Sequence, residues 1–274
     1  MNGFPSAPAW VILSVCLVCC FGNAKSGAAQ LRQARVTRVI RDVRLLAPSA
    51  EAVKAELNQA IGDGTAIRTG VDSRAEIAFD GQSLVRSGAN TLFLVRKGTR
   101  DLDLEEGAIL FSVPLGISGP TIKTGALTVE IAGTTGIIER HGGEYVKILL
   151  LQGEGRAYLR RIGESVLIQA GQLLITKPQA ESLPEPVNYD IGQLYKTSLL
   201  TNLDFAPLQS KSLIDQEIEK QKSDPNFIPT NLVIFGRGTV VNLVEPTPSS
   251  AGSADPTASP SPARLSPGKS KRKL

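Results

Sequence analysis

Alternation of apolar and polar residues predicts short β-strands through the middle of the chain. Ala75, Ile77 and Phe79 fall on one side of the stretch 75–80, and polar or small residues fall on the other. Leu102 and Leu104 alternate in the same way with the acidic residues of 101–105. A period of two is typical of a strand with one buried face. Together with frequent glycine, this pattern predicts an all-β domain over residues 35–178.

Some apolar runs do not alternate, and these predict strands that are covered on both faces. They occupy residues 146–151, 166–168 and 173–175. Two packed layers or coils would bury such strands. Because glycine accepts backbone conformations that other residues avoid, we expect the intervening turns at the glycines. The predicted turns are Gly62–Gly64, Asp80–Gly81, Ser87–Gly88, Lys97–Gly98, Gly107, Gly119–Pro120, Gly142–Gly143, Gly153–Gly155 and Gly171.

Helical spacing predicts helices in two regions of the chain, and a hairpin is predicted after them. Residues 49–57 predict one short helix early in the chain, because Ala50, Val53 and Leu57 share a helical face. Residues 188–223 predict a short helical segment with two helices, the second opening on a capping-box-like sequence at Ser212 and ending before Pro225. Residues 228–244 contain two apolar runs separated by glycines and predict a hairpin.

The two ends of the chain differ from its middle. Residues 9–21 form an apolar run that is shorter than the ~20 residues of a membrane span. Small residues follow this run, so residues 1–29 are predicted to be a cleaved signal peptide that directs the protein to the periplasm or the medium. A retained segment and lipidation at Cys20 are the alternatives. Residues 245–274 are rich in Pro, Ser and basic residues and predict a disordered tail.

Charge and cysteine usage narrow the classes of function. The net charge of +4 comes mainly from five basic residues in the last eleven, and aromatic residues make up only 5%. A nucleic-acid partner is therefore not expected. Membrane contact could arise through the N-terminal segment or the basic tail. All three cysteines lie in the N-terminal apolar run, which excludes disulfides and cysteine chemistry from the predicted domain.

Few residues offer catalytic or metal chemistry, and we predict no catalytic residue, cofactor or metal site. The single histidine, His141, is expected at an exposed loop tip. The acidic run 101–106 precedes a glycine at the seventh position, whereas a calcium loop needs it at the sixth. We expect a solvated strand face there. The rival hypothesis is an envelope polysaccharide hydrolase that pairs these carboxylates with Glu130 or Glu139.

The glycine-containing blocks resemble those of the FecR domain family over about residues 36–176. The clearest block is residues 61–76, IGDGTAIRTGVDSRAE, followed by similar blocks at 82–91, 107–114, 122–124, 132–136, 151–155 and 170–172. One departure is Ala132, where the family commonly has arginine before Gly-Thr. The residues that carry the resemblance are Gly62, Asp63, Arg68, Thr69, Gly70, Ser73, Arg74, Gly107, Gly133, Thr134 and Gly153.

The resemblance implies an exported, non-enzymatic domain of jelly-roll or β-helix-like architecture. The family is best known from transducers that relay the state of an iron-siderophore receptor to a sigma factor. Only eight residues precede the apolar run here, so we expect a binding, sensory or scaffolding module in the envelope instead. Its expected partner is another envelope protein or a cell-wall polysaccharide. A membrane-tethered signalling subunit related to iron-transport regulators is the alternative.

Overall fold

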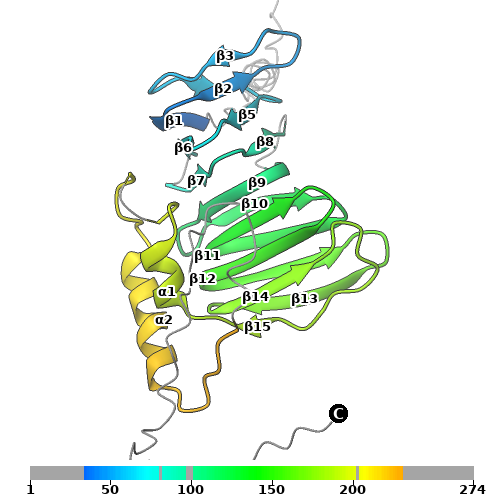
Figure 1. The fold of residues 1–274 in the computed structure, drawn as a ribbon, viewed down its shortest axis with the longest axis vertical. Helices are drawn as coiled ribbons and strands as arrows, with labels where there is room; N and C mark the ends of the chain where they lie inside the picture. Colours follow the sequence, from blue (N-terminus) through cyan, green and yellow to red (C-terminus); the bar gives the residue numbers. More distant parts are fainter. Residues whose placement is uncertain (1–33, 80–81, 97–100, 202–203, 231–274) are drawn as a thin grey trace, which may run out of the picture. The chain divides into compact units, whose positions relative to one another are not determined.

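The computed structural model describes residues 34–79, 82–96, 101–201 and 204–230. The predicted signal peptide, the predicted disordered tail and most of the hairpin predicted at 228–244 lie outside these ranges. The turns predicted at Asp80–Gly81 and Lys97–Gly98 also fall outside them. Within them, strands dominate and two short helices follow, which confirms the predicted all-β class (Figure 1). No helix in the described ranges is both long and apolar enough to span a membrane.

The described strands follow one another closely along the chain. They are β1 (Ala34–Ile40), β2 (Val43–Leu46), β3 (Val53–Lys54), β4 (Ala60–Ile61), β5 (Ala66–Thr69), β6 (Arg74–Ala78), β7 (Leu84–Ser87), β8 (Leu92–Val95), β9 (Leu102–Ser112), β10 (Ser118–Thr124), β11 (Leu127–His141), β12 (Tyr145–Leu159), β13 (Glu164–Gln169), β14 (Gln172–Thr176) and β15 (Val187–Asn188). The helices are α1 (Ile191–Thr197) and α2 (Lys211–Ser223).

The strands form two paths of hydrogen-bonded neighbours, and three long strands, β9, β11 and β12, connect these paths. One path runs β4-β1-β6-β7 and the other β3-β2-β5-β8. They meet in β9, whose first half pairs with β8 and whose second half pairs with β7. In the same way β11 pairs with β10 and then with β9, and β12 pairs with β14 and then with β13. The long strands therefore pass from one path to the other.

The main core contains the apolar side chains that alternation assigned to it. Ala75, Ile77, Leu102 and Leu104 are fully buried in one hydrophobic cluster, and Phe79 packs against it. The stretch 146–151 is buried throughout, as predicted for a strand covered on both faces, although Lys147 interrupts its apolar residues. Burial of this apolar surface is the main force that stabilises the fold.

Three predicted turns are wrong, because they lie inside strands. Gly107 lies in β9, Gly119–Pro120 in β10 and Gly153–Gly155 in β12. Gly107 and Gly153 have positive φ angles of 85° and 81°, at the points where their strands exchange one set of partners for another. Glycine is needed there because an L-residue is strained at such angles. The glycine thus indicated a bend in a strand and not a reversal of the chain.

The helix predicted at 49–57 and the double burial of 166–168 are also wrong. Val53 belongs to β3, and the amide of Ala55 donates to the carbonyl of Val43 at 2.8 Å. Val53 and Leu57 are 49% and 62% exposed. The apolar face of the predicted helix would therefore have no surface to pack against. Leu167 is 37% exposed and its neighbour Ile168 is fully buried, so β13 is covered on one face only.

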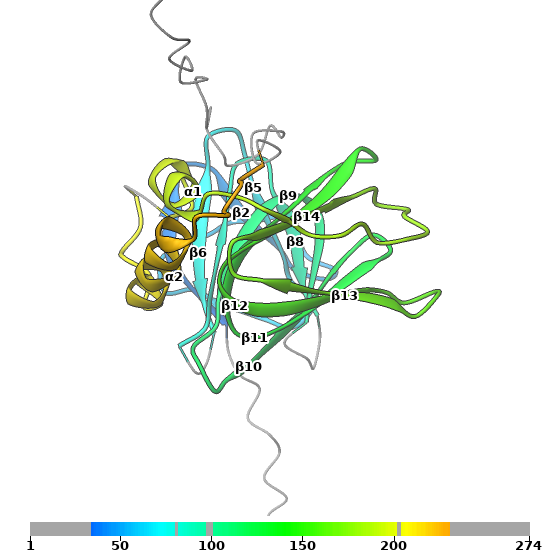
Figure 2. The ribbon, with the colours of Figure 1, turned by 90° about the horizontal axis from the view of Figure 1, so that it is seen from below.

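The predicted helices are present and cover the outer face of the sheet. Asp190 caps α1 by accepting from the amide of Gln193 at 2.8 Å, and α2 ends at Ser223, with Asp224 as its C-cap before the proline. The capping box at Ser212 is not formed, because α2 begins one residue earlier and Ser210 is its N-cap. Figures 1 and 2 show both helices side by side against the sheet.

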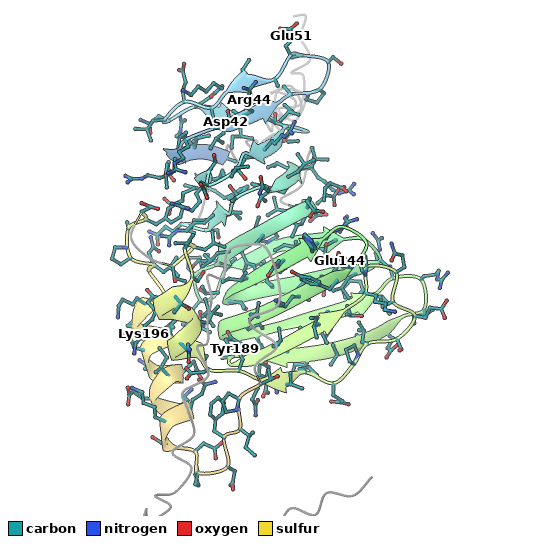
Figure 3. All side chains as sticks on the ribbon, in the orientation of Figure 1. Asp42, Arg44, Glu51, Glu144, Tyr189 and Lys196 are labelled. Carbon is teal, nitrogen blue, oxygen red and sulfur yellow. The ribbon has the colours of Figure 1, made fainter. Side chains whose placement is uncertain are left out.

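A second layer of buried apolar residues lies beneath the helices. Leu110, Ile137 and Leu149 are fully buried but stand outside the main core cluster, so they face the opposite side of the sheet. Tyr189 lies between the sheet and the helices, and its hydroxyl donates to the carbonyl of Leu150 at 2.8 Å (Figure 3). The helical segment is therefore packed on the β domain.

Candidate binding groove

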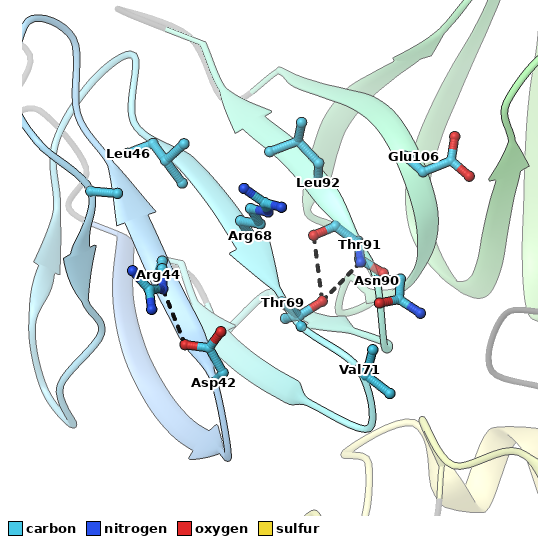
Figure 4. A pocket seen from close by; sticks show the side chains of 12 residues that line it. Asp42, Arg44, Leu46, Arg68, Thr69, Val71, Asn90, Thr91, Leu92 and Glu106 are labelled. Carbon is cyan, nitrogen blue, oxygen red and sulfur yellow. Dashed lines mark hydrogen bonds and ion pairs between the residues drawn. The ribbon is translucent and has the colours of Figure 1, made fainter.

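A groove of about 630 Å³ opens on one face of strands β2, β5, β8 and β9 (Figure 4). This volume is in the usual range for a ligand site. The residues that line it are Asp42, Arg44, Leu46, Ala52, Arg68, Thr69, Gly70, Val71, Asn90, Thr91, Leu92 and Glu106. The lining is thus a mixture of charged, hydroxyl, amide and aliphatic groups, with no aromatic ring.

Strand register brings four of these residues into one row. Arg44 lies opposite Arg68, and Arg68 lies opposite Leu92. Leu92 in turn lies opposite Glu106. Residues that pair directly across neighbouring strands project to the same face of a sheet. The row therefore runs across the groove, with two cations at one end and a carboxylate at the other.

Thr69 and Gly70 fix the floor of the groove. The hydroxyl of buried Thr69 donates to the carbonyl of Gly88 at 2.5 Å and accepts from the amide of Thr91 at 2.9 Å. The amide of Gly70 donates to the carbonyl of Asp42 at 2.9 Å. These bonds join β5 to the loop before β8 and to the start of β2, and so hold the row of side chains in place.

The two arginines of the groove differ in their partners. The Nε of Arg44 lies 3.2 Å from Asp42 Oδ1, in an ion pair whose side chains are more than half exposed. Arg68 makes no hydrogen bond or ion pair with any residue that the structure describes. Val71, at the groove's rim, is 73% exposed, which is unusual for a large aliphatic side chain. The groove therefore offers an unpaired cation next to apolar surface.

The residues predicted from the family motifs divide between this groove and other places. Arg68, Thr69 and Gly70 line the groove. Ser73 shapes its rim, since its hydroxyl donates to the carbonyl of Val71 and accepts from the amide of Asp42. Arg74 points elsewhere and forms an ion pair with Asp204.

The remaining motif residues support the backbone. Gly62 and Asp63 form the turn before β5, and Gly107 packs against Thr91 at the edge of the groove. Gly133, Thr134 and Gly153 lie together where β11 and β12 bend, and Thr134 donates to the carbonyl of Glu154 at 2.6 Å.

Sequence reasoning did not assign Asp42, Arg44 or Asn90 to a site, and it considered Glu106 only as part of the acidic run 101–106. For Arg44 the one visible signal was its equal spacing along the chain with Arg68 and Leu92. That spacing has meaning only once the three strands are known to pair in this register.

The acidic residues 101–106 are paired and not free. Asp101 lies 3.3 Å from Lys123, Asp103 pairs with Arg96, Glu105 lies 3.5 Å from Arg140, and Glu106 lies 3.4 Å from His141. Asp103 is also buried, so the expectation of a solvated strand face is wrong at that position. Within the described ranges, no group of three or more His, Cys, Asp or Glu residues is placed to hold a metal ion.

His141 is the last residue of β11 and not the tip of a loop, which corrects the prediction. Its ring is 30% exposed and lies between the carboxylates of Glu106 and Glu144. Nearby, Lys147 and Glu139 form a buried pair with 3.6 Å between Nζ and Oε2, and Tyr145 donates to Glu139 at 2.8 Å. Burial lowers the pKa of Lys147, while Glu139 opposes that shift.

Outside the groove, Arg86 is a second deeply buried cation. Its guanidinium donates to Glu76 at 2.8 Å and to the carbonyls of Leu200 and Ala206 at 2.9 and 2.6 Å. It also lies 4.6 Å from the centre of the Phe205 ring. Burial lowers its pKa, and the hydrogen bond with Glu76 opposes the shift. Arg86 thus attaches the segment between the two helices to the sheet.

Comparisons with known proteins give one family and a small set of structures. The model of the FecR protein family matches residues 65–154. Two crystal structures of a "putative anti-sigma factor" from Parabacteroides distasonis ATCC 8503 are similar at 14% and 15% identity. They cover 60% and 65% of this chain and 82% and 85% of their own, each with a TM-score of 0.41. No curated protein matches the chain.

Proposed function

Since residues 65–154 of this chain are a FecR domain, as its motifs predicted, we propose that the protein is a binding module that acts outside the cytoplasm. FecR proteins are in general non-enzymatic regulators. In this proposal the protein holds a partner polypeptide of the envelope in the groove and catalyses no reaction. The signal-peptide-like N-terminus supports the location.

The groove carries this proposal. It lies within and beside the family-matched residues, and its floor is formed by Thr69 and Gly70 of the family motif. An exposed aliphatic residue at the rim and an unpaired arginine inside are features of recognition surfaces. Loops and strand ends that are rigidly held are common places for binding residues.

The hydrolase alternative receives little support from the described residues. A glycosidase needs two carboxyl groups that face each other across a substrate. Glu130 accepts from Tyr158 at 3.0 Å, and Glu139 is buried against Lys147. Asp101, Asp103 and Glu105 are also paired to cations, so these carboxylates serve the structure of the sheet.

Cross-linking in the producing cell tests the proposed function. A photoreactive phenylalanine analogue placed at Val71, on the rim of the groove, should give a discrete adduct that protease degrades. The analogue at Ile162, which is exposed but does not line the groove, is the control and should give none. Equal adducts at both positions, or none at Val71, would contradict the proposal. An adduct that only a cell-wall hydrolase degrades would indicate a polysaccharide partner.

Location is tested by fractionation and the N-terminal residue of the native protein. A soluble extracytoplasmic form that begins near Lys25 or Gln30 is expected. A membrane-bound form that retains Met1–Phe21 would instead support the tethered signalling subunit.

A further inference from the structure

We propose that the groove selects an extended peptide segment that carries an acidic residue and, four residues away, a basic one. This inference rests on the proposed function and specifies the chemistry of the partner. It comes from the row formed by Arg44, Arg68, Leu92 and Glu106, which strand register places on one face of the sheet.

The two arginines indicate the acidic residue of the ligand. Arg44 and Arg68 lie directly opposite each other on neighbouring strands. Like charges in this position destabilise a sheet, so a carboxylate between them would remove a repulsion as well as form hydrogen bonds. Asp42 offsets only part of this charge, because its ion pair with Arg44 is exposed and exposed pairs contribute little.

The aliphatic lining indicates a peptide more than a polysaccharide. Leu46, Ala52 and Leu92 lie beside the arginines, and Val71 extends the apolar surface to the rim. Aliphatic side chains of a peptide pack well against such residues. Aromatic rings, on which the flat faces of sugars commonly stack, are absent from the residues that line this groove.

Glu106 sets the polarity and the spacing of the ligand. It lies beyond Leu92, at the opposite end of the row from the arginines, and accepts from the amide of Gly142 at 2.8 Å. Its negative charge would repel an acid there and attract a base. Neighbouring strands are about 4.8 Å apart, so the arginine pair and Glu106 are separated by roughly 10 to 14 Å. An extended peptide rises about 3.3 Å per residue and alternates its side chains between two faces, so residues four apart project to the same face and are about 13 Å apart. An apolar residue between the charges would face Leu92.

Selection from a random heptapeptide library displayed on phage tests this inference with the full-length mature protein. The selected peptides should be enriched in Asp or Glu four residues from Lys or Arg. A fluorescent peptide that contains Glu-Ala-Leu-Ala-Lys should then bind with saturation. Replacing its Glu by Gln should weaken binding about tenfold or more, because a charge-assisted pair is lost.

Two charge reversals in the protein make the result specific. Arg68→Glu should abolish binding of the Glu-Ala-Leu-Ala-Lys peptide. It should leave the thermal midpoint unchanged or raised, because it places opposite charges across β2 and β5. Arg160→Glu changes the net charge equally in the turn after β12, outside the groove, and should leave binding unchanged.

Three outcomes would overturn the inference. They are selected peptides without the acid–base pattern, an equal loss of binding in both variants, and saturable binding of an acidic oligosaccharide such as oligogalacturonate without any peptide selection. The cross-link at Val71 distinguishes a failure of this inference from a failure of the proposed function. If Val71 forms an adduct in cells but the selected peptides lack the acid–base pattern, the binding function remains and only the proposed chemistry of the partner is wrong.

Discussion

Gly107 shows how much of this domain depends on single backbone positions. Its φ of +85° lies where β9 leaves β8 and joins β7 and β11. A Cβ atom at this residue would lie 2.6 Å from the Cα of Thr91 and 2.8 Å from the carbonyl oxygen of Asn90. Both atoms belong to the backbone that borders the groove, and neither can rotate away. Only glycine allows β9 to bend against this loop.

Gly107→Ala should therefore lower the free energy of unfolding by about 3 kcal/mol or more, through backbone strain and overlap together. Urea unfolding measures this change. Gly143→Ala is the matched control, because a Cβ there meets nothing within 4 Å. Gly116→Ala, with a positive φ of 76° but open space, should fall between the two. A loss below about 1 kcal/mol at Gly107 would contradict the assigned role.

At the level of elements, the helical segment is bound to the sheet by polar as well as apolar contacts. Arg86 on β7 binds the carbonyls of Leu200 and Ala206, and Arg74 on β6 pairs with Asp204. Ser210, the N-cap of α2, shares a hydroxyl contact of 2.8 Å with Thr135 on β11. The segment that follows the family-matched residues is therefore an integral part of the folded body.

Arg86→Gln should destabilise the protein by about 3 to 5 kcal/mol, because it leaves Glu76 without its cation and removes donors from buried carbonyls. Amide hydrogen exchange should rise in α1 and α2 more than in β12, whose strand pairing is untouched. Arg96→Gln removes an ion pair with Asp103, away from the helices, and serves as the comparison. If exchange rose equally over all elements, Arg86 would not specifically anchor the segment.

For the molecule as a whole, buried tyrosines determine much of the response to alkaline pH. Burial raises the pKa of Tyr189 well above 10, with Asp190 adding to the shift, and burial also raises that of Tyr145. In the unfolded chain these groups lose their protons near pH 10. Above that pH the folded state binds more protons than the unfolded state, so stability falls as pH rises. Lys147 and Arg86, whose pKa values are lowered, act in the opposite direction.

Tyr189→Phe isolates one of these groups. At pH 8 the variant should be about 1 kcal/mol less stable than the wild type, because the hydrogen bond to the carbonyl of Leu150 is lost. The difference should shrink by roughly 1.4 kcal/mol per pH unit above about pH 10, since the variant has no hydroxyl to ionise on unfolding. Urea unfolding at pH 8 and at about pH 11 measures it. A constant difference over this range would show that Tyr189 ionises equally in both states.

The sequence by itself determined the features that depend on neighbouring residues. Period-two alternation identified Ala75, Ile77, Leu102 and Leu104 as core residues, because side chains on a strand alternate between its faces. The apolar spacing after residue 188 and the stop before Pro225 located both helices within a few residues. The family motif drew attention to the Arg-Thr-Gly stretch that forms part of the groove.

Only the tertiary structure decided how these elements meet. Gly107 and Gly142 both have positive φ angles. The local sequence does not show that Gly107 bends a strand whereas Gly142 reverses the chain. Long-range pairing also placed Arg44 opposite Arg68 and buried the charges of Arg86 and Lys147. These features depend on residues far apart in the chain, and strand register is a property of the assembled sheet. Local pattern therefore defines strands and core, whereas the groove exists only once four strands have paired.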